Sequence, residues 1–543
     1  MNAYTGTGRL VRLGLRRDRI QLPVWIVGTV LMLYASQSAI TTQYGTEADR
    51  VELLRTAVTS PAILFLRATP TGPGAGQMIM FQVLPFLVVL AGLMSTFAVV
   101  RHTRQEEETG RAEMIGSTVV GRFALLSAAL IVVAIANLVL GVLVALVLIG
   151  GGEAAAGSFA AGLAVALGGL VFGAIAGVTA QVTQTSRAAN GLAAGAVGIA
   201  YVLRGIGDST GTVNANGYTM TTSWETWLSP IGWAQLVHPY AGDRWWVFLI
   251  SLAAVAACLA AAFTVAGRRD VGLGLIAPRP GPSTAPRGLS SPLGLAWRLQ
   301  RGVFYSWAIS LGGFGLLLGS LSTTVSEAFD ENTSATETIS NLAGGASGGI
   351  VDTFFAGMMA IIGFLVAAYV VQALLRLRGE ESGGQAEPVL ATATGRLSWL
   401  GSHLLVAMAG AAALLVIVGV TTGLVYGQSV DEIGNQIGRM TGAALVQLPP
   451  VLLIGGFVVL VFGLLPRLTV SLAWAALAVS LVFGQLGAMF NLPQGVRDIS
   501  PFTHVPALPV ADPRALPVVA LVVIAAALLG AGTASFRRRD LAM

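Results

Sequence analysis

The sequence contains no lysine and a single cysteine, Cys258, among its 543 residues. One thiol cannot form an intrachain disulfide, so the fold is held together without such cross-links. The absence of lysine excludes a P-loop of the form G-x4-G-K-[ST], whose lysine reaches the phosphates of a nucleotide. Charged residues make up only 10% of the chain, against about 25% in soluble domains. So little charge cannot cover a globular surface in water, which predicts that lipid surrounds most of the chain.

Long apolar runs dominate the sequence instead. A helix that crosses the hydrocarbon core of a bilayer needs about 20 mostly apolar residues. The tenth such run contains Pro449 and Pro450, where we expect a kink because proline removes a helical hydrogen bond. The predicted fold class is an all-α polytopic membrane protein with about twelve transmembrane helices. The predicted spans are 22–40, 78–100, 123–149, 158–182, 188–204, 247–267, 303–321, 354–375, 399–424, 441–464, 468–490 and 515–535.

The distribution of arginine predicts the orientation of these spans. If the N-terminus is cytoplasmic and the spans alternate, most of the 31 basic residues lie in cytoplasmic segments, as the positive-inside rule requires. Both termini are then cytoplasmic, and the abundance of Ala, Gly, Val and Arg favours a GC-rich bacterial genome and the bacterial plasma membrane. Arg9, Arg12, Arg16 and Arg19 form one stripe on a helix, which predicts an interfacial helix held by anionic membrane lipid.

One charged stretch occurs twice. Residues 106–122 read EEETGRAEMIGSTVVGR, and residues 380–396 read EESGGQAEPVLATATGR. We align Glu107-Glu108 with Glu380-Glu381, then allow a one-residue insertion, after which Ala-Glu and Gly-Arg match at an offset of 274. Three further landmarks recur in the same order: R-x2-R-x5-W at 16–25 and 298–307, Ser-Pro at 229–230 and 500–501, and Arg-Arg-Asp at 268–270 and 538–540.

These repeats predict two tandem halves of six spans each. An even number of spans leaves both halves pointing the same way, related by an axis along the membrane normal. The predicted domains are a first half at 1–275, a cytoplasmic linker rich in proline and glycine at 276–292, and a second half at 293–543.

The repeated acidic stretch has two interpretations. Glu106 and Glu113 are seven residues apart and would share one face of a short surface helix, with Met114 and Ile115 at its apolar edge. A solvated turn between two spans would need no more than this. Repetition of E-E-[ST]-G at the same place in each half favours a docking surface for a cytoplasmic partner.

The pattern R-x-x-E-E-x-G-R-x-E, read from Arg104 to Glu113, resembles the coupling-helix region of type-2 ABC exporter permeases. The Arg-Arg-Asp after the last span and LSPIGW at 228–233 are similar to the same family. The fused two-half form resembles the tetronasin-type permeases of actinobacterial multidrug efflux. The resemblance implies ATPase-coupling roles for Arg104, Glu107, Glu108, Arg111, Glu113, Glu380, Glu381 and Glu387.

The same resemblance implies how such a permease works. It would extrude hydrophobic compounds such as antibiotics, driven by two copies of a separate ABC ATPase that binds ATP and Mg²⁺. This chain itself is expected to bind no cofactor, metal or nucleic acid. The first, second and fifth spans of each half would line the substrate path, which brings in Phe81, Phe86, Tyr201, Phe355, Phe364 and Tyr369. Short outer turns closing the exit are expected at Ser229, Pro230, Ser500 and Pro501.

Two other classes of protein remain as alternatives. An ion-coupled secondary drug transporter can also have twelve spans, but it usually needs ionisable residues deep in the membrane, and the predicted spans hold few. A membrane enzyme would need clustered carboxylates or histidines, and the four histidines are scattered. The acids Glu327, Asp330, Glu331 and Glu337 could bind a cation, although a solvated loop explains them as well.

Overall fold

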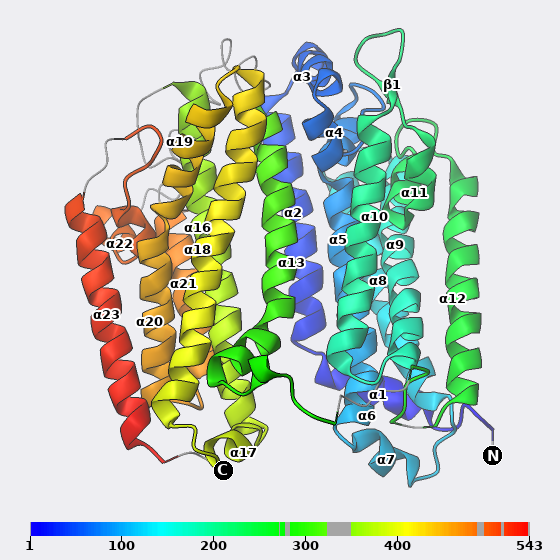
Figure 1. Cartoon of the computed structure of the whole chain (residues 1–543). Helices are drawn as coiled ribbons and strands as arrows, with labels where there is room; N and C mark the ends of the chain where they lie inside the picture. Colours follow the sequence, from blue (N-terminus) through cyan, green and yellow to red (C-terminus); the bar gives the residue numbers. More distant parts are fainter. Residues whose placement is uncertain are drawn as a thin grey trace. The chain divides into compact units, whose positions relative to one another are not determined.

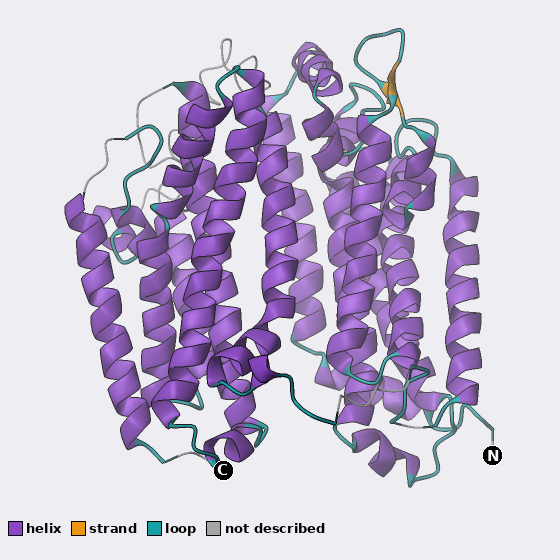
Figure 2. Ribbon diagram, in the orientation of Figure 1, coloured by secondary structure: helices purple, strands orange, loops and turns teal. Residues whose placement is uncertain are grey.

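The computed structural model describes residues 2–270, 272–276, 283–322, 349–485, 493–511 and 515–540. The acidic group at 327–337, residues 277–282 of the predicted linker and the end of the predicted eleventh span lie outside these residues. The described chain is overwhelmingly helical (Figure 2), apart from the short antiparallel pair β1 (Thr212–Val213) and β2 (Met220–Thr221). The fold class is therefore an all-α polytopic membrane protein, as predicted.

The contacts within the chain define two compact units, Met1–Gly281 (unit 1) and Pro282–Met543 (unit 2). Eleven helices in the described ranges are long and apolar enough to cross a membrane. In unit 1 these are α2 (Gln21–Gln43), α5 (Ala75–His102), α8 (Ala124–Gly150), α9 (Ala155–Val182), α10 (Ser186–Ser209) and α12 (Phe248–Arg268). In unit 2 these are α13 (Pro292–Ser320), α16 (Ile350–Ser382), α18 (Arg396–Ser429), α19 (Ile433–Leu445) with α20 (Leu448–Leu464), and α23 (Ala515–Arg538).

Two details differ from the simplest interpretation of the predicted spans. The expected interruption of the tenth span falls at residues 446–447, between α19 and α20 and directly before Pro449 and Pro450. Where the eleventh span is predicted, the described residues hold a shorter apolar helix, α21 (Thr469–Ser480) followed by η4 (Leu481–Gln485).

Shorter helices connect the spans. In unit 1 they are α1 (Thr7–Arg17), α3 (Glu47–Thr59), α4 (Pro61–Leu66), α6 (Arg104–Glu108), α7 (Arg111–Gly116), η1 (Trp224–Leu228), α11 (Pro230–Leu236) and η2 (Trp245–Val247). In unit 2 they are η3 (Arg287–Leu289), α17 (Ala386–Leu390), α22 (Gln494–Arg497) and η5 (Pro501–His504).

Helix α9 is the central helix of unit 1 and packs against α5, α8 and α12. Small residues allow this packing, because apolar side chains gain nothing from burial when lipid is the solvent. Gly141 of α8 lies against Gly162 of α9, where a Cβ on Gly141 would stand 2.7 Å from the Gly162 carbonyl oxygen. In unit 2 the closest helix pairs are α13 with α18 and α20 with α23.

Helices α1, α6 and α7 gather at the end of unit 1 where α12 finishes, whereas α3, α4, α11 and the β1–β2 hairpin lie at the opposite end (Figure 1). In unit 2, α17 and the C-terminal end of α23 likewise share one end (Figure 1). Each unit therefore places its acidic stretch beside the end of its last span.

Candidate functional site

The first acidic stretch forms two short helices rather than one. Helix α6 ends at Glu108, and α7 begins at Arg111 after Gly110, whose φ of 73° lies in the left-handed region that favours glycine. The prediction that Glu106 and Glu113 share the face of one helix is therefore wrong. Glu106 is buried, whereas Glu113 is exposed.

Glu107 occupies the centre of this element and faces inward. Its side chain is only 8% exposed and accepts hydrogen bonds from Arg104 Nη1 (2.7 Å) and from both terminal nitrogens of Arg269. Arg104 also donates from Nε to the Ala180 carbonyl oxygen (2.8 Å), which lies in the last turn of α9. A cation suits this position because the last carbonyls of a helix carry partial negative charge. Glu107 thus ties α6 to the residues that follow α12.

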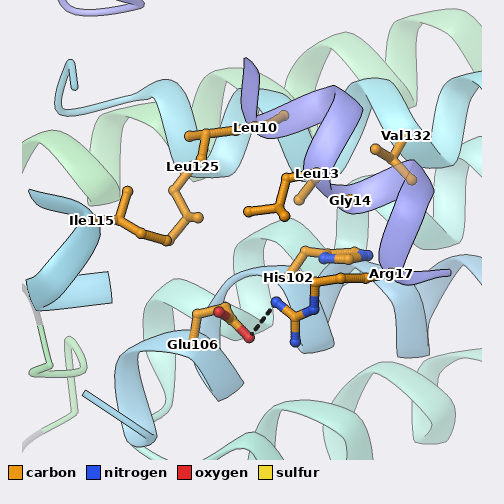
Figure 3. A pocket seen from close by; sticks show the side chains of 11 residues that line it. Leu10, Leu13, Gly14, Arg17, His102, Glu106, Ile115, Leu125 and Val132 are labelled. Carbon is orange, nitrogen blue, oxygen red and sulfur yellow. Dashed lines mark ion pairs between the residues drawn. The ribbon is translucent and has the colours of Figure 1, made fainter. Parts of the chain in front are cut away.

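The neighbouring glutamates make separate contacts. Glu106 Oε1 pairs with Arg17 Nη1 of α1 at 2.8 Å (Figure 3) and with the more exposed Arg111 at 3.5 Å. Glu108 accepts hydrogen bonds from the backbone nitrogen and the hydroxyl of Ser186, the first residue of α10. Glu113 and Met114 are part of the exposed surface of the element, and Met114 is 69% exposed.

The second acidic stretch repeats this arrangement within unit 2. Glu381 is 3% exposed and accepts two hydrogen bonds from Arg539, at 2.6 and 2.8 Å. Arg378 Nη1 lies 3.7 Å from the same carboxylate. Gly384, with φ of 69°, precedes α17, and Pro388 fits there because it occupies the first helical turn.

These contacts change the alignment of the two stretches. Glu107 corresponds to Glu381, because each accepts hydrogen bonds from the second arginine of an Arg-Arg-Asp sequence. A uniform offset of 274 then also pairs Gly110 with Gly384, the two glycines with positive φ. The one-residue insertion and the pairing of Glu107 with Glu380 are therefore wrong. Glu380 instead pairs with Arg376 at 2.9 Å and lies 3.7 Å from His403.

A small crevice open to the surface lies between α1, α7, α8 and the end of α5 (Figure 3). Its walls are apolar, with Leu10 and Leu13 on α1, and its charged end is the Arg17–Glu106 pair. Next to it, burial raises the pKa of Asp18, but the hydrogen bond from His102 and the nearby arginines outweigh this and lower the pKa overall. Helix α1 is therefore held to the acidic element by the Arg17–Glu106 pair and to the end of α5 by Asp18, while Arg9, Arg12 and Arg16 remain exposed.

The six predicted substrate-path residues do not line this crevice. In unit 1, Phe86 and Tyr201 lie in contact, with ring centroids 6.2 Å apart, and Phe81 is buried beneath Arg67. In unit 2 the three residues are buried in separate contacts: Phe355 with Tyr426, Phe364 with Phe502, and Tyr369 with Phe304 and Trp307. Their role in a substrate path stays a prediction.

The predicted outer turns are two short helices. Ser229 begins α11: its hydroxyl accepts hydrogen bonds from the Ile231 and Gly232 nitrogens and donates to the Ala200 carbonyl oxygen of α10. Pro230 follows at the first position of α11, where proline is favoured. In unit 2, Pro501 likewise follows a serine at the start of η5, but the fully buried Ser500 side chain accepts no capping hydrogen bond there. Whether they close an exit stays a prediction.

The loop after α11 gives the protein a predictable sensitivity to acid. Burial and the neighbouring Arg244 lower the pKa of His238 from 6.5 to about 4. The folded protein therefore keeps His238 neutral between these pH values while the unfolded chain takes up a proton, so stability is lost as pH falls from 6.5 towards 4. We expect His238→Asn to reduce this loss by about 2 kcal/mol, measured as the melting temperature in detergent at pH 7.5 and pH 4.5.

Asparagine is suitable for that test because His238 has φ of 52°, a conformation that asparagine tolerates. His504, which is part of η5 in unit 2, serves as the control. An acid loss identical in His238→Asn and the wild type would contradict the assignment.

Sequence reasoning missed the arginines that pair with the acidic residues. The sequence marks Arg269 and Arg539 only as parts of the repeated Arg-Arg-Asp landmark, and Arg17 lies outside the predicted arginine stripe near the N-terminus. A signal was present, because a glutamate flanked by apolar spans needs a counter-charge, and each half ends in the same arginine sequence.

These observations define the class of the protein: a polytopic helical membrane protein with one ion-paired acidic element in each of its two units. The chain is 39% identical to the multidrug efflux system permease protein Rv1217c of Mycobacterium tuberculosis (strain ATCC 25618 / H37Rv) over 541 aligned residues. This alignment covers 99% of this chain and 96% of that relative. The family model of the C-terminal domain of multidrug efflux system permease Rv1217c matches residues 289–537. The chain therefore belongs to the family of multidrug efflux permeases, and it is a membrane transport component.

Proposed function

We propose that this chain is the permease subunit of an ATP-driven exporter of the type-2 ABC class, in its fused tetronasin-type form. Its substrates are hydrophobic compounds, among them antibiotics. Two copies of a separate ABC ATPase drive it, one at each acidic element, and that ATPase binds the ATP and Mg²⁺. Both termini and both acidic elements face the cytoplasm of a bacterial plasma membrane.

The observation that carries this proposal is the repeated acidic element itself. In both units a buried glutamate fixes the element to the end of the last span, and a glycine with positive φ starts a short helix. Each short helix then presents an exposed glutamate, Glu113 in α7 and Glu387 in α17. Rigid elements that present the same side chain twice fit two copies of one partner.

The chain's own composition supports a separate motor. It has no lysine and therefore no P-loop. Membership of a multidrug efflux permease family supports the outward transport of hydrophobic compounds. For the substrate path we retain the predicted aromatic residues, of which Phe86 on α5 and Tyr201 on α10 are already in contact.

Docking is tested at the exposed glutamates. We expect Glu113→Arg combined with Glu387→Arg to reduce copurification of the ATPase encoded beside this gene by about tenfold or more, because charge at the centre of an interface is replaced by its opposite. Glu107 is unsuitable for this test, since its replacement alone would break the buried ion pairs that hold α6 in place.

Glu52→Arg is the matched control, because Glu52 is equally exposed but lies on α3 at the opposite end of unit 1. It should leave copurification unchanged. Normal assembly of the Glu113→Arg/Glu387→Arg variant would contradict docking at these elements.

Reconstitution in sealed vesicles separates the proposal from an ion-coupled transporter. Drug transport should require ATP and the ATPase subunit, and should persist when the proton and sodium gradients are collapsed. Transport by the purified chain alone, driven by an ion gradient, would overturn the proposed function.

A further inference from the structure

Among the candidate spans in the described part of each unit, the last span is the least embedded in the protein. Only 22% of the most apolar window of α12 and 17% of that of α23 is buried inside the protein. Helix α12 packs mainly against α9, and α23 mainly against α20. Packing along their length therefore gives these helices little support, and the contacts at their ends matter more.

In unit 1 the end of α12 is clamped by charge. Arg104, Glu107 and Arg269 form what we call the first latch, with the Glu107 carboxylate between the two guanidinium groups. Arg122, at the start of α8, donates hydrogen bonds to the carbonyl oxygens of Ala266 (3.2 Å) and Arg269 (3.0 Å). The end of α12 is thus bound on one side by the acidic element and on the other by α8.

Unit 2 has the same clamp. Arg378, Glu381 and Arg539 form the second latch, and Arg539 also lies over the rings of Phe462 and Phe536. Arg396 Nη1, at the start of α18, donates to the Arg539 carbonyl oxygen at 2.8 Å. Corresponding residues thus connect the acidic element to the end of the last span in both units, although the Arg378–Glu381 pair is longer than the Arg104–Glu107 pair.

We propose that the two latches make the last span of each unit move together with its acidic element, and that Arg269 and Arg539 are positioning residues in the transport cycle. This inference rests on the proposed function, in which the ATPase pushes on the acidic elements. Separation of a buried carboxylate from its arginines leaves uncompensated charge in a low-dielectric site, which is strongly unfavourable. The acidic element and the end of the last span therefore shift as one body. The last span, which has few other contacts, then moves when the ATPase moves the acidic element.

The test compares arginines that are adjacent in sequence. In Arg269→Glu we expect the drug transported per ATP hydrolysed to fall about tenfold, a coupling loss of the size that single positions produce. The exchange Glu107→Arg/Arg269→Glu should recover transport per ATP to within about threefold of the wild type, because Arg104 can pair with a carboxylate at either position. Arg268→Glu is the control, since Arg268 is exposed and forms no ion pair within the described part of the chain.

Transport per ATP separates a positioning role from simple loss of protein, because a folding defect lowers transport and hydrolysis in proportion. If Arg269→Glu does not fold, Arg269→Lys keeps the charge without the two-pronged geometry and should lower transport per ATP by about threefold. Wild-type transport per ATP in the folded Arg269 variant would overturn the proposal, and so would an exchange variant as impaired as Arg269→Glu.

A distance measurement tests the latch even if no ATPase binds. Cys258 is the only cysteine, so Cys258→Ser provides a background for spin labels at Glu113→Cys and Arg268→Cys, both exposed positions. We expect a narrow distance distribution in this background, a broad one after Arg269→Glu, and a narrow one again in the exchange variant. Equal widths in all three would overturn the latch, whereas failure of the wild type to bind an ATPase would overturn only the proposed function.

Discussion

Replacing Asp208 by alanine is expected to lower the free energy of unfolding by about 3–5 kcal/mol, because it leaves a buried guanidinium without its counter-charge. Asp208 and Arg204 lie one turn apart on α10, 3.1 Å apart and both fully buried. Asp208 Oδ1 also accepts hydrogen bonds from Thr69 Oγ1 (2.9 Å) and Thr226 Oγ1 (3.3 Å). The substitution therefore removes contacts that join α10 to the segments containing Thr69 and Thr226. The loss of stability is measured by thermal unfolding in detergent, followed by tryptophan fluorescence.

The matched control is an ion pair of the same composition in unit 2. Arg439 and Asp352 are 2.8 Å apart, but their side chains are 35% and 27% exposed. Asp352→Ala should cost less than about 1 kcal/mol, because solvent screens an exposed pair and solvates the residue left behind. If both alanine variants melted at the same temperature, burial of the Arg204–Asp208 pair would not have the predicted importance.

The Arg204–Asp208 ion pair shows where hydropathy fails to predict the end of a transmembrane helix. The predicted fifth span, 188–204, stops at Arg204, whereas α10 continues to Ser209 because Arg204 is neutralised by a residue four positions later in the same helix. The last span is predicted closely, 515–535 against Ala515–Arg538, whereas α13 begins at Pro292, well before the predicted start at 303. The length and composition of an apolar run predict whether a segment crosses the membrane. They do not show that a charged residue within the helix is neutralised by an ion pair in the folded protein.

The acidic elements show the corresponding limit for the site. The sequence indicates that Glu107 and Glu381 occupy special positions, because charge is rare and the stretch is repeated. It does not show which way the side chains face, since Arg269, one of the two arginines that pair with Glu107, lies 162 residues further along the chain. Glu107 and Glu381 therefore face inward to internal arginines, whereas Glu113 and Glu387 are exposed, and the coupling role of these residues stays a prediction.

The second large effect is expected at the contact between α8 and α9. In Gly162→Leu, the new side chain would meet the Gly141 carbonyl oxygen and, at 3.2 Å, the Cβ of Ala145. The two helices must separate to admit it, and α9 is the most buried span of unit 1, with 78% of its most apolar window inside the protein. We expect a loss of about 3 kcal/mol, measured as the melting temperature in detergent.

Gly195→Leu provides the control for that substitution. Gly195 lies within α10 and is exposed, and no neighbouring atom of the described chain lies within 4 Å of the place that its Cβ would take. Leucine there should be neutral or stabilising by up to about 1 kcal/mol, because it replaces a weak helix former without steric conflict. A loss confined to Gly162→Leu would show that close backbone approach, rather than glycine's effect on helix propensity, holds α8 against α9. Equal losses at both positions would contradict that account, since only one of the two glycines faces another helix.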